Sequence, residues 1–320
     1  MNTDQSGTRE AADVLNPRVG PLLVVISSIS FGLLPLFSMW SESGGGAVEM
    51  RLGLRFLIGA MLLTGLALRE RAPWPGGGRL AGLVVLGAGV YSAQSFCFFT
   101  ALDRGTPSGL VSLLLYLYPV SVTLGAWLIL RERLSASRWI AVALAMAGLV
   151  LTVWPMVSVM GRADGSGSTA IPGGMVGIGL GLFSGMAYAV YILVASRVVT
   201  RRTALTATAV VCWSAAAVFI GVAASRGHSL PSTVLGWTGV LALGVVGTAV
   251  AMGCFLAGSA WIGPVRASTI SILEPVTTVV IGSLLLGEGF AAVQLAGGAL
   301  ILSGALMAGL PPGRSGRDGA

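Results

Sequence analysis

Residues 271–288 read SILEPVTTVVIGSLLLGE, and residues 115–132 read LYLYPVSVTLGAWLILRE. In each stretch a Pro-Val pair is followed by a Glu, and further along the chain by a Gly, at matching distances. These landmarks recur 156 residues apart, as Pro119 and Pro275 (275 − 119), Glu132 and Glu288 (288 − 132), and Gly148 and Gly304 (304 − 148). The equal spacing indicates an internal duplication of the chain.

The composition places both copies in a membrane. Of the 320 residues, 55% are apolar and 10% are charged, whereas a soluble domain carries about 25% charged residues. This excludes a water-soluble globule and a disordered chain. The 47 glycines are typical of close helix packing in a membrane, because small residues let helix backbones approach. The three cysteines lie inside apolar runs without metal-ligand spacing, so we expect neither a disulfide framework nor a metal site.

A helix that crosses the hydrocarbon core needs about 20 mostly apolar residues. Ten such runs occur, five in each copy, and the sequence therefore predicts an all-α membrane protein of ten transmembrane helices. The predicted helices are Pro21–Trp40, Val48–Leu68, Leu80–Ala101, Pro107–Leu130, Trp139–Val157, Pro172–Ser196, Leu205–Ala224, Val234–Ser259, Pro264–Leu286 and Ala292–Gly309.

These helices form two predicted five-helix repeats, separated by a polar, Gly/Ser-rich linker. The expected segments are a cytoplasmic tail at 1–20, a first repeat at 21–157, the linker at 158–171, a second repeat at 172–309 and a disordered tail at 310–320. Because five is an odd number, the second repeat has to enter the membrane from the opposite side. The sequence thus predicts inverted repeats.

The arginines orient the predicted bundle. With the N-terminus in the cytoplasm, the inside segments hold fourteen arginines and the outside segments three, as the positive-inside rule requires. We therefore expect both termini in the cytoplasm and a multi-pass protein of the cell (inner) membrane. The same asymmetry accounts for the net charge of +7 without nucleic acid as a partner.

The duplicated stretches resemble the EamA repeat of the drug/metabolite transporter superfamily. The likeness is carried by Phe99-Thr-Ala-Leu102, residues 115–132, Trp139–Leu151, residues 271–288 and Gln294–Gly304. The resemblance implies helices one to four and six to nine around a central cavity, with helices five and ten at the periphery. It also implies export of amino acids, metabolites or toxic compounds. The first copy departs from the second at Tyr118, which stands where the second has Glu274.

Glu274 is the strongest candidate for a functional residue. It lies about ten residues into the predicted helix Pro264–Leu286, roughly 15 Å along its axis and so near mid-membrane. A carboxylate there costs roughly 2.5–3.5 kcal/mol unless it is paired or hydrated, and Pro275 frees a carbonyl beside it. Two interpretations stay open: a site for a proton or a substrate ammonium group, and a structural ion pair or hydrogen bond to a neighbouring helix.

Arg55 lies well inside the predicted helix Val48–Leu68. It is interpreted either as a clamp for a substrate carboxylate or phosphate, or as a partner of Glu274 or of a helix C-terminus. Arg51, one turn earlier, is expected to extend to the outer interface. Glu49, at the helix start, is expected to complement the helix dipole.

Helix three carries Tyr91, Gln94, Ser95 and Phe98 at i, i+3, i+4 and i+7, which places them on one semi-polar, aromatic face. The residues expected to extend this lining are Tyr116, Tyr118, Tyr188 and Tyr191. Such a face suits a cavity for an amphipathic solute, and ordinary helix packing is the alternative for any single residue.

Glycines recur every four residues on helix six, at Gly173, Gly177, Gly181 and Gly185. This stripe predicts close contact with a neighbouring helix. The motif acids Glu132 and Glu288 lie at predicted helix ends, where we expect them to cap.

Taken together, these features favour a secondary transporter that exports small metabolites, amino acids or amphipathic toxic compounds by alternating access around a central cavity. The alternative within this class is an importer or facilitator of a small metabolite. A membrane-embedded enzyme is less favoured, because the single histidine, His228, lies in a loop. We expect a small-molecule substrate and membrane lipid as partners and no cofactor, and a homodimer is left open.

Overall fold

The computed structural model describes residues 19–118, 120–122, 124, 136–160, 174–262, 267, 270–271, 273–287 and 291–309, and these residues form helices and turns without a strand among them. The tails at 1–18 and 310–320, the linker stretch 161–173, and Pro119, Glu132 and Glu288 lie outside the described residues. What the sequence predicts for those positions stays a prediction.

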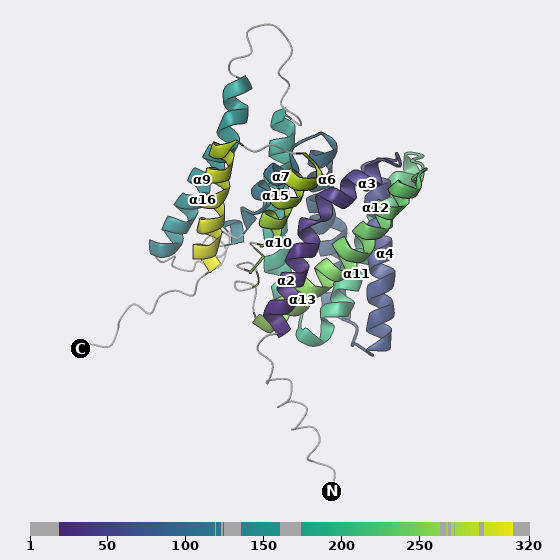
Figure 1. The fold of residues 1–320 in the computed structure, drawn as a ribbon. Helices are drawn as coiled ribbons and strands as arrows, with labels where there is room; N and C mark the ends of the chain where they lie inside the picture. Colours follow the sequence, from purple (N-terminus) through teal and green to yellow (C-terminus); the bar gives the residue numbers. More distant parts are fainter. Residues whose placement is uncertain are drawn as a thin grey trace, which may run out of the picture.

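The described helices follow the predicted order (Figure 1). In the first half they are α2 (Val19–Gly32), α3 (Leu34–Glu42), α4 (Val48–Arg69), α5 (Gly77–Val85), the π-helix η1 (Leu86–Tyr91), α6 (Ser92–Asp103), α7 (Ser108–Leu115) and α9 (Ala136–Met160). In the second half they are α10 (Gly174–Val198), the 3₁₀-helix η2 (Arg201–Thr203), α11 (Ala204–Ser225), α12 (Val234–Gly244), the π-helix η3 (Val245–Val250), α13 (Ala251–Ile262), α15 (Leu273–Leu285) and α16 (Ala292–Gly309).

Six helical runs are long and apolar enough to cross a membrane. They are Val19–Glu42, Val48–Arg69, Gly77–Asp103, Gly174–Val198, Arg201–Ser225 and Val234–Ile262. Within the other four predicted spans the apolar helical stretch is shorter, 10–17 residues, over the part of the chain that the structure describes. The architecture is that of a multi-pass, all-α membrane protein.

The two halves pack against each other through equivalent pairs of helices. α4 lies against α11, α2 against α13, and α6 against α10. The pair α9 and α16 stands at the side of the bundle, and the two helices run in opposite directions (Figure 1). This peripheral position is the one that the resemblance implies for helices five and ten.

The contact between α9 and α16 is reciprocal. A Cβ atom added at Gly148 would lie 2.7 Å from the backbone nitrogen of Ile301, and one added at Gly304 would lie 2.9 Å from the backbone nitrogen of Ala145. Ala145 and Ile301 are themselves 156 residues apart (301 − 145), as are Gly148 and Gly304 (304 − 148). When a contact between two residues is repeated by their equivalents in the other copy, the two copies are related by two-fold symmetry. The packing of α9 on α16 therefore reflects the duplication.

Two π-helices, which the sequence did not predict, occupy matching places in helices three and eight. In η1, Gly87 lies so close to α11 that an added Cβ would be 2.6 Å from the carbonyl oxygen of Val211. Next to η3, Gly244 approaches the side chain of Ile58 on α4 equally closely. π-Turns inside α-helices are frequent at functional sites. No local sequence pattern predicts these π-helices, and the close contacts of Gly87 and Gly244 are made with residues of the other half of the chain.

The predicted glycine stripe of α10 is confirmed for Gly177, Gly181 and Gly185, whereas Gly173 lies outside the described residues. Gly177 faces the Thr106 side chain, and Gly181 faces Leu114 of α7. Gly185 faces the carbonyl oxygens of Leu114 and Leu115. These glycines therefore let α10 pack closely against α7.

We expect Gly185→Ala to destabilise the protein by about 1–3 kcal/mol, the range for overpacking. Its Cβ would lie 2.8 Å from the carbonyl oxygen of Leu115, a backbone atom that cannot turn away. The matched control is Gly179→Ala on the same helix, where a Cβ meets nothing within 4 Å and helix propensity improves. Melting temperatures in detergent measure both, and equal values for the two variants would contradict the packing described.

Candidate functional site

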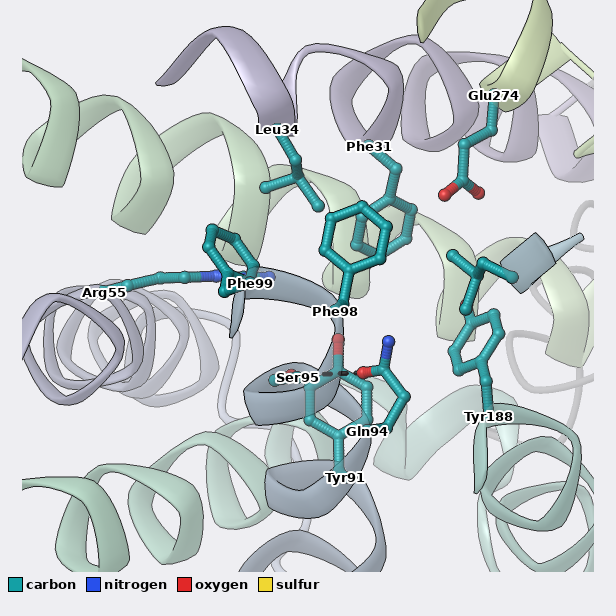
Figure 2. A pocket seen from close by; sticks show the side chains of 11 residues that line it. Phe31, Leu34, Arg55, Tyr91, Gln94, Ser95, Phe98, Phe99, Tyr188 and Glu274 are labelled. Atoms are coloured by element: carbon teal, nitrogen blue, oxygen red, sulfur yellow. Dashed lines mark hydrogen bonds between the residues drawn. The ribbon is translucent and has the colours of Figure 1, made fainter. Parts of the chain in front are cut away.

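A narrow cavity of about 20 Å³ lies between the two halves (Figure 2). It is lined by Phe31, Leu34, Arg55, Tyr91, Gln94, Ser95, Phe98, Phe99, Leu115, Tyr188 and Glu274. In this conformation that space holds about one water molecule. The wall is apolar and aromatic, and a few polar groups converge on it.

Seven of the eight residues predicted from the sequence line this cavity: Arg55, Tyr91, Gln94, Ser95, Phe98, Tyr188 and Glu274. Tyr118 does not line it, but its ring packs edge-on against Tyr188 with the centroids 4.9 Å apart. Sequence reasoning missed Phe31, Leu34, Phe99 and Leu115. For Phe31 and Leu34 a signal existed: the helix breaks between α2 and α3, just before Pro35, and interrupted helices often line transporter sites.

Arg55 is buried and is held by the other half of the chain. Its Nε donates to Thr248 Oγ1 at 2.7 Å, and its Nη2 donates to the Gly247 carbonyl oxygen at 3.1 Å. Both acceptors belong to η3, where the Thr248 hydroxyl itself donates to Leu243. The guanidinium also lies 4.9 Å from the ring centroid of Phe99, within cation–π range. The π-helix thus supplies the groups that make a buried charge tolerable.

Glu274 points its carboxylate into the cavity (Figure 2). Its side chain is buried, and within the described part of the chain the carboxylate has neither a hydrogen bond nor an ion pair. It belongs to the first turn of α15, where the helix dipole favours negative charge.

The position of Glu274 corrects one expectation. The sequence placed it about ten residues into a continuous helix, but the chain turns at Ser271 and α15 begins only at Leu273. Pro275 explains the difference, because it has no N–H to donate to the carbonyl of Ser271 four residues earlier and is suited to the first helical turn. The first half shows a matching break at Tyr116–Leu117, after α7.

Arg55 and Glu274 share the cavity without pairing. Both residues lie in the described part of the chain, and no ion pair joins them. Figure 2 shows the rings of Phe31 and Phe98 between the guanidinium and the carboxylate. Of the interpretations that the sequence left open for Arg55, direct pairing with Glu274 is therefore wrong.

The polar groups of helix three are linked to α10. Gln94 Nε2 donates to Ser184 Oγ at 3.1 Å, and Ser184 Oγ donates back to the Gln94 carbonyl oxygen. Ser95 Oγ donates to Gln94 Oε1 at 3.1 Å. These bonds fix the amide of Gln94 at the cavity wall, on the face that the helical spacing predicts.

All five tyrosines of the chain form one buried cluster beside the cavity. Tyr91 lies 4.7 Å from Tyr191, and Tyr188 lies 4.9 Å from Tyr118 and 6.0 Å from Tyr191, measured between ring centroids. Tyr116 continues the cluster at 5.3 Å from Tyr118. Such rings offer apolar faces to a solute and attract cationic groups.

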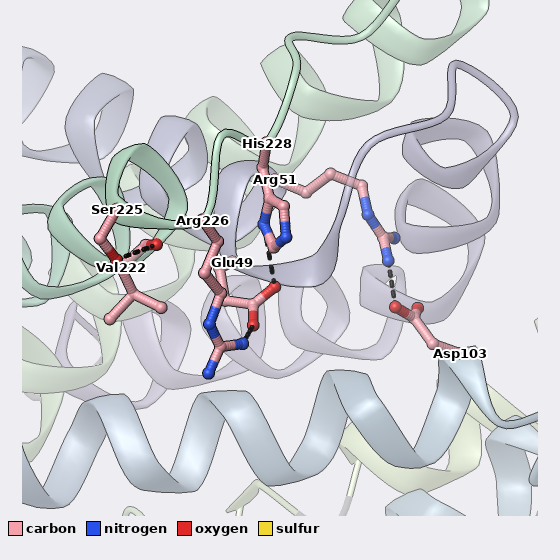
Figure 3. A network of polar contacts seen from close by, with 7 residues as sticks. All are labelled: Glu49, Arg51, Asp103, Val222, Ser225, Arg226 and His228. Carbon is pink, nitrogen blue, oxygen red and sulfur yellow. Dashed lines mark hydrogen bonds and ion pairs between the residues drawn. The ribbon is translucent and has the colours of Figure 1, made fainter.

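A network of charged side chains joins helices at one end of the bundle (Figure 3). Arg51, at the start of α4, pairs with Asp103 at the end of α6. Glu49 pairs with Arg226 at 2.6 Å and lies 3.6 Å from His228, both of which follow α11. Arg51 was expected to reach the interface, but only 2% of its side chain is exposed. The reason is Asp103, which the fold brings next to it from 52 residues away.

A model of the EamA-like transporter family matches residues 18–154 and 175–310. An uncharacterized transporter of Archaeoglobus fulgidus is 25% identical over 91% of this chain and 96% of its own length. The uncharacterized transporter YcbK of Bacillus subtilis is 27% identical over 92% of each chain. A solved crystal structure of 20% identity, covering 92% of this chain and 97% of its own, has a TM-score of 0.64, a likeness of fold.

We expect Thr248→Val to destabilise the protein by about 1–3 kcal/mol, because it removes the hydroxyl that Arg55 Nε bonds and leaves a buried charge with one partner fewer. Thr248→Ser keeps that hydroxyl and is expected to be close to the parent. Thr238→Val on the exposed face of α12 is the control, since its hydroxyl bonds only its own helix. A melting temperature for Thr248→Val equal to that of Thr238→Val would show that the bond contributes nothing.

Proposed function

The chain belongs to the EamA-like transporter family, and we propose that it is a secondary transporter that exports small metabolites, amino acids or amphipathic toxic compounds. The solute binds in the central cavity, which is exposed alternately to the two sides of the membrane. The observation that carries this proposal is the placement of Arg55 and Glu274 on opposite sides of one cavity without contact between them.

The charges suggest the chemistry of the solute. Arg55 has five N–H donors, and the bonds to Thr248 and Gly247 use its Nε and Nη2. The guanidinium therefore keeps donors for a carboxylate of the solute. Glu274 is free to take up an ammonium group or another cationic group. The rings of Phe31 and Phe98 between them suit an apolar side chain, so the lining suits an amphipathic zwitterion once the halves move apart to admit it.

Glu274 is also the candidate for coupling to an ion gradient. A buried carboxylate without a partner is costly, and either a proton or a bound cation relieves that cost. If the carboxylate is protonated in one conformation of the transporter and charged in another, movement of the solute can be coupled to movement of a proton. The first-half counterpart is Tyr118, so coupling at this position would use the second half alone.

We further propose that the bundle consists of ten membrane spans arranged as two inverted five-helix repeats. Support comes from the reciprocal contacts of Gly148 and Gly304, from the matching π-helices, and from the opposite directions of α9 and α16 in Figure 1. Two family matches of nearly equal length agree with this division.

Both termini are proposed to lie in the cytoplasm, on the strength of the arginine asymmetry. We expect green fluorescent protein fused to the C-terminus to fluoresce and alkaline phosphatase fused there to be inactive. The matched control is fusion after Gly227, behind α11, where the phosphatase should be active and the fluorescent protein dark. The reverse pattern at the two sites would contradict the orientation.

We expect Glu274→Gln to keep the folded yield and to lose export by about 10- to 100-fold, the factor that one charge-assisted contact represents. The yield should hold because the carboxylate has no partner among the described residues that the substitution would break. Export is measured as survival of a host on a panel of amino acids, their analogues and amphipathic cations, followed by efflux from proteoliposomes. Glu70→Gln, at the exposed end of α4, is the control.

The same panel decides between the alternatives. Protection of the host supports export, whereas increased sensitivity supports an importer. The effects of Arg55→Gln and Glu274→Gln on stability should add, because the two residues are not paired. A double variant clearly more stable than the sum of the two single effects, or a Glu274→Gln variant that exports like the parent, would contradict the proposed site.

A further inference from the structure

A second cavity, of about 230 Å³, lies between the last turns of α10 and α13. This is the end of the bundle at which α2 begins, because Gly20 approaches Trp261 and Ile262 there. In the proposed orientation it is the cytoplasmic end, opposite to the ion pairs of Arg51 and Glu49.

The two cavities adjoin at one pair of aromatic rings. Tyr188 lines the central cavity, and Phe255 lines the second one. Their ring centroids are 6.3 Å apart, and both side chains are buried. Ile192, one helical turn after Tyr188 on the same face of α10, already lines the second cavity. The same stripe of α10 therefore runs from one cavity into the other.

The lining of the second cavity differs from that of the first. It offers the hydroxyls of Ser196, Thr200 and Ser259 among apolar side chains, and none of the described residues that line it is charged. A solute inside it finds weak polar contacts, and the charges of the central cavity lie beyond the rings. This is the order expected of an entrance, which has to admit a solute without retaining it.

The rim of this cavity is fixed by Arg201. Its Nε donates to the carbonyl oxygen of Ala260 at 3.1 Å, and its guanidinium lies 4.4 Å from the ring centroid of Trp261. These contacts hold the end of α13 against the turn that follows α10. At the opposite end the pairs Arg51–Asp103 and Glu49–Arg226 join α4 to α6 and to the segment after α11. One end is therefore closed by ion pairs, while the other carries the larger cavity.

We propose that the second cavity is the cytoplasmic vestibule through which a solute reaches the central cavity, and that Tyr188 and Phe255 form the barrier between the two. This inference rests on the proposed transport function and orientation. It identifies the route within the bundle, between α10 and α13, and the side chains that have to separate for a solute to pass.

Thiol accessibility tests the route without knowledge of the solute. Single cysteines are placed at Ser259 in the vestibule and at Ser95 in the central cavity, in a background with Cys97, Cys212 and Cys254 replaced by Ala. The probe is a membrane-impermeant cationic methanethiosulfonate, applied to inside-out or right-side-out vesicles. Gln94→Cys serves as a second central reporter should Ser95→Cys fold poorly. Monodisperse gel filtration and full labelling after denaturation verify each variant.

The expected result has two parts. Ser259→Cys should react rapidly in inside-out vesicles and slowly in right-side-out ones. Ser95→Cys should react slowly in both, and Phe255→Ala or the milder Phe255→Leu should raise its rate in inside-out vesicles by about tenfold, since a ring contact of the barrier is lost. Leu256→Ala is the matched control, because Leu256 lines the same cavity and has no ring to pack on Tyr188.

Labelling of Ser259→Cys only from the outer face would overturn the vestibule. Equal rates for the central reporter with Phe255→Ala, Phe255→Leu and Leu256→Ala would overturn the barrier. Because labelling needs no transport, its outcome is separate from that of the export assays. Vesicles that label as expected but move no solute would refute the proposed function and leave the route standing, and the converse result would refute the route alone.

Discussion

Inside an apolar bundle every backbone N–H and C=O has to find its partner within the protein, because hydrocarbon offers none. This constraint makes the chain helical, and it also decides where the helices are allowed to break. The breaks gather around the central cavity: between α2 and α3, at the π-helices η1 and η3, at Tyr116–Leu117 and at Ser271. Groups at these breaks also bond side chains of other helices, as the Gly247 carbonyl does with Arg55.

The backbone is nearly symmetric, but the chemistry of the cavity is not. Gly148 and Gly304 make equivalent contacts in the two repeats, whereas Glu274 has Tyr118 as its counterpart. A duplicated fold provides two similar walls, and substitutions in one copy give the space between them a positive and a negative side. In the proposed function these charges act on the same solute from opposite halves, and a relative movement of the halves would change both contacts together.

Three features along the bundle fit one conformation. Ion pairs close the end that carries Arg51 and Glu49, the aromatic pair Tyr188 and Phe255 separates the cavities, and the larger cavity lies at the other end. Salt bridges are suited to a closure that has to open, since exposed or wetted pairs contribute little net stability. Arg226, with 60% of its side chain exposed, is such a partner, whereas the buried Arg51 makes the firmer contact.

Local patterns in the sequence determined the membrane class, the duplication, the approximate helix bounds, the glycine face of α10 and seven of the residues that line the cavity. Hydropathy, spacing and helical period are properties of neighbours in the chain, so they can be read directly. Only the tertiary structure decided that Arg51 is buried against Asp103, that Glu274 begins a helix, and that Arg55 bonds Thr248 instead of Glu274. The partner of Arg55 lies 193 residues away, and the energy of a buried charge depends on which groups folding brings within a few ångströms of it.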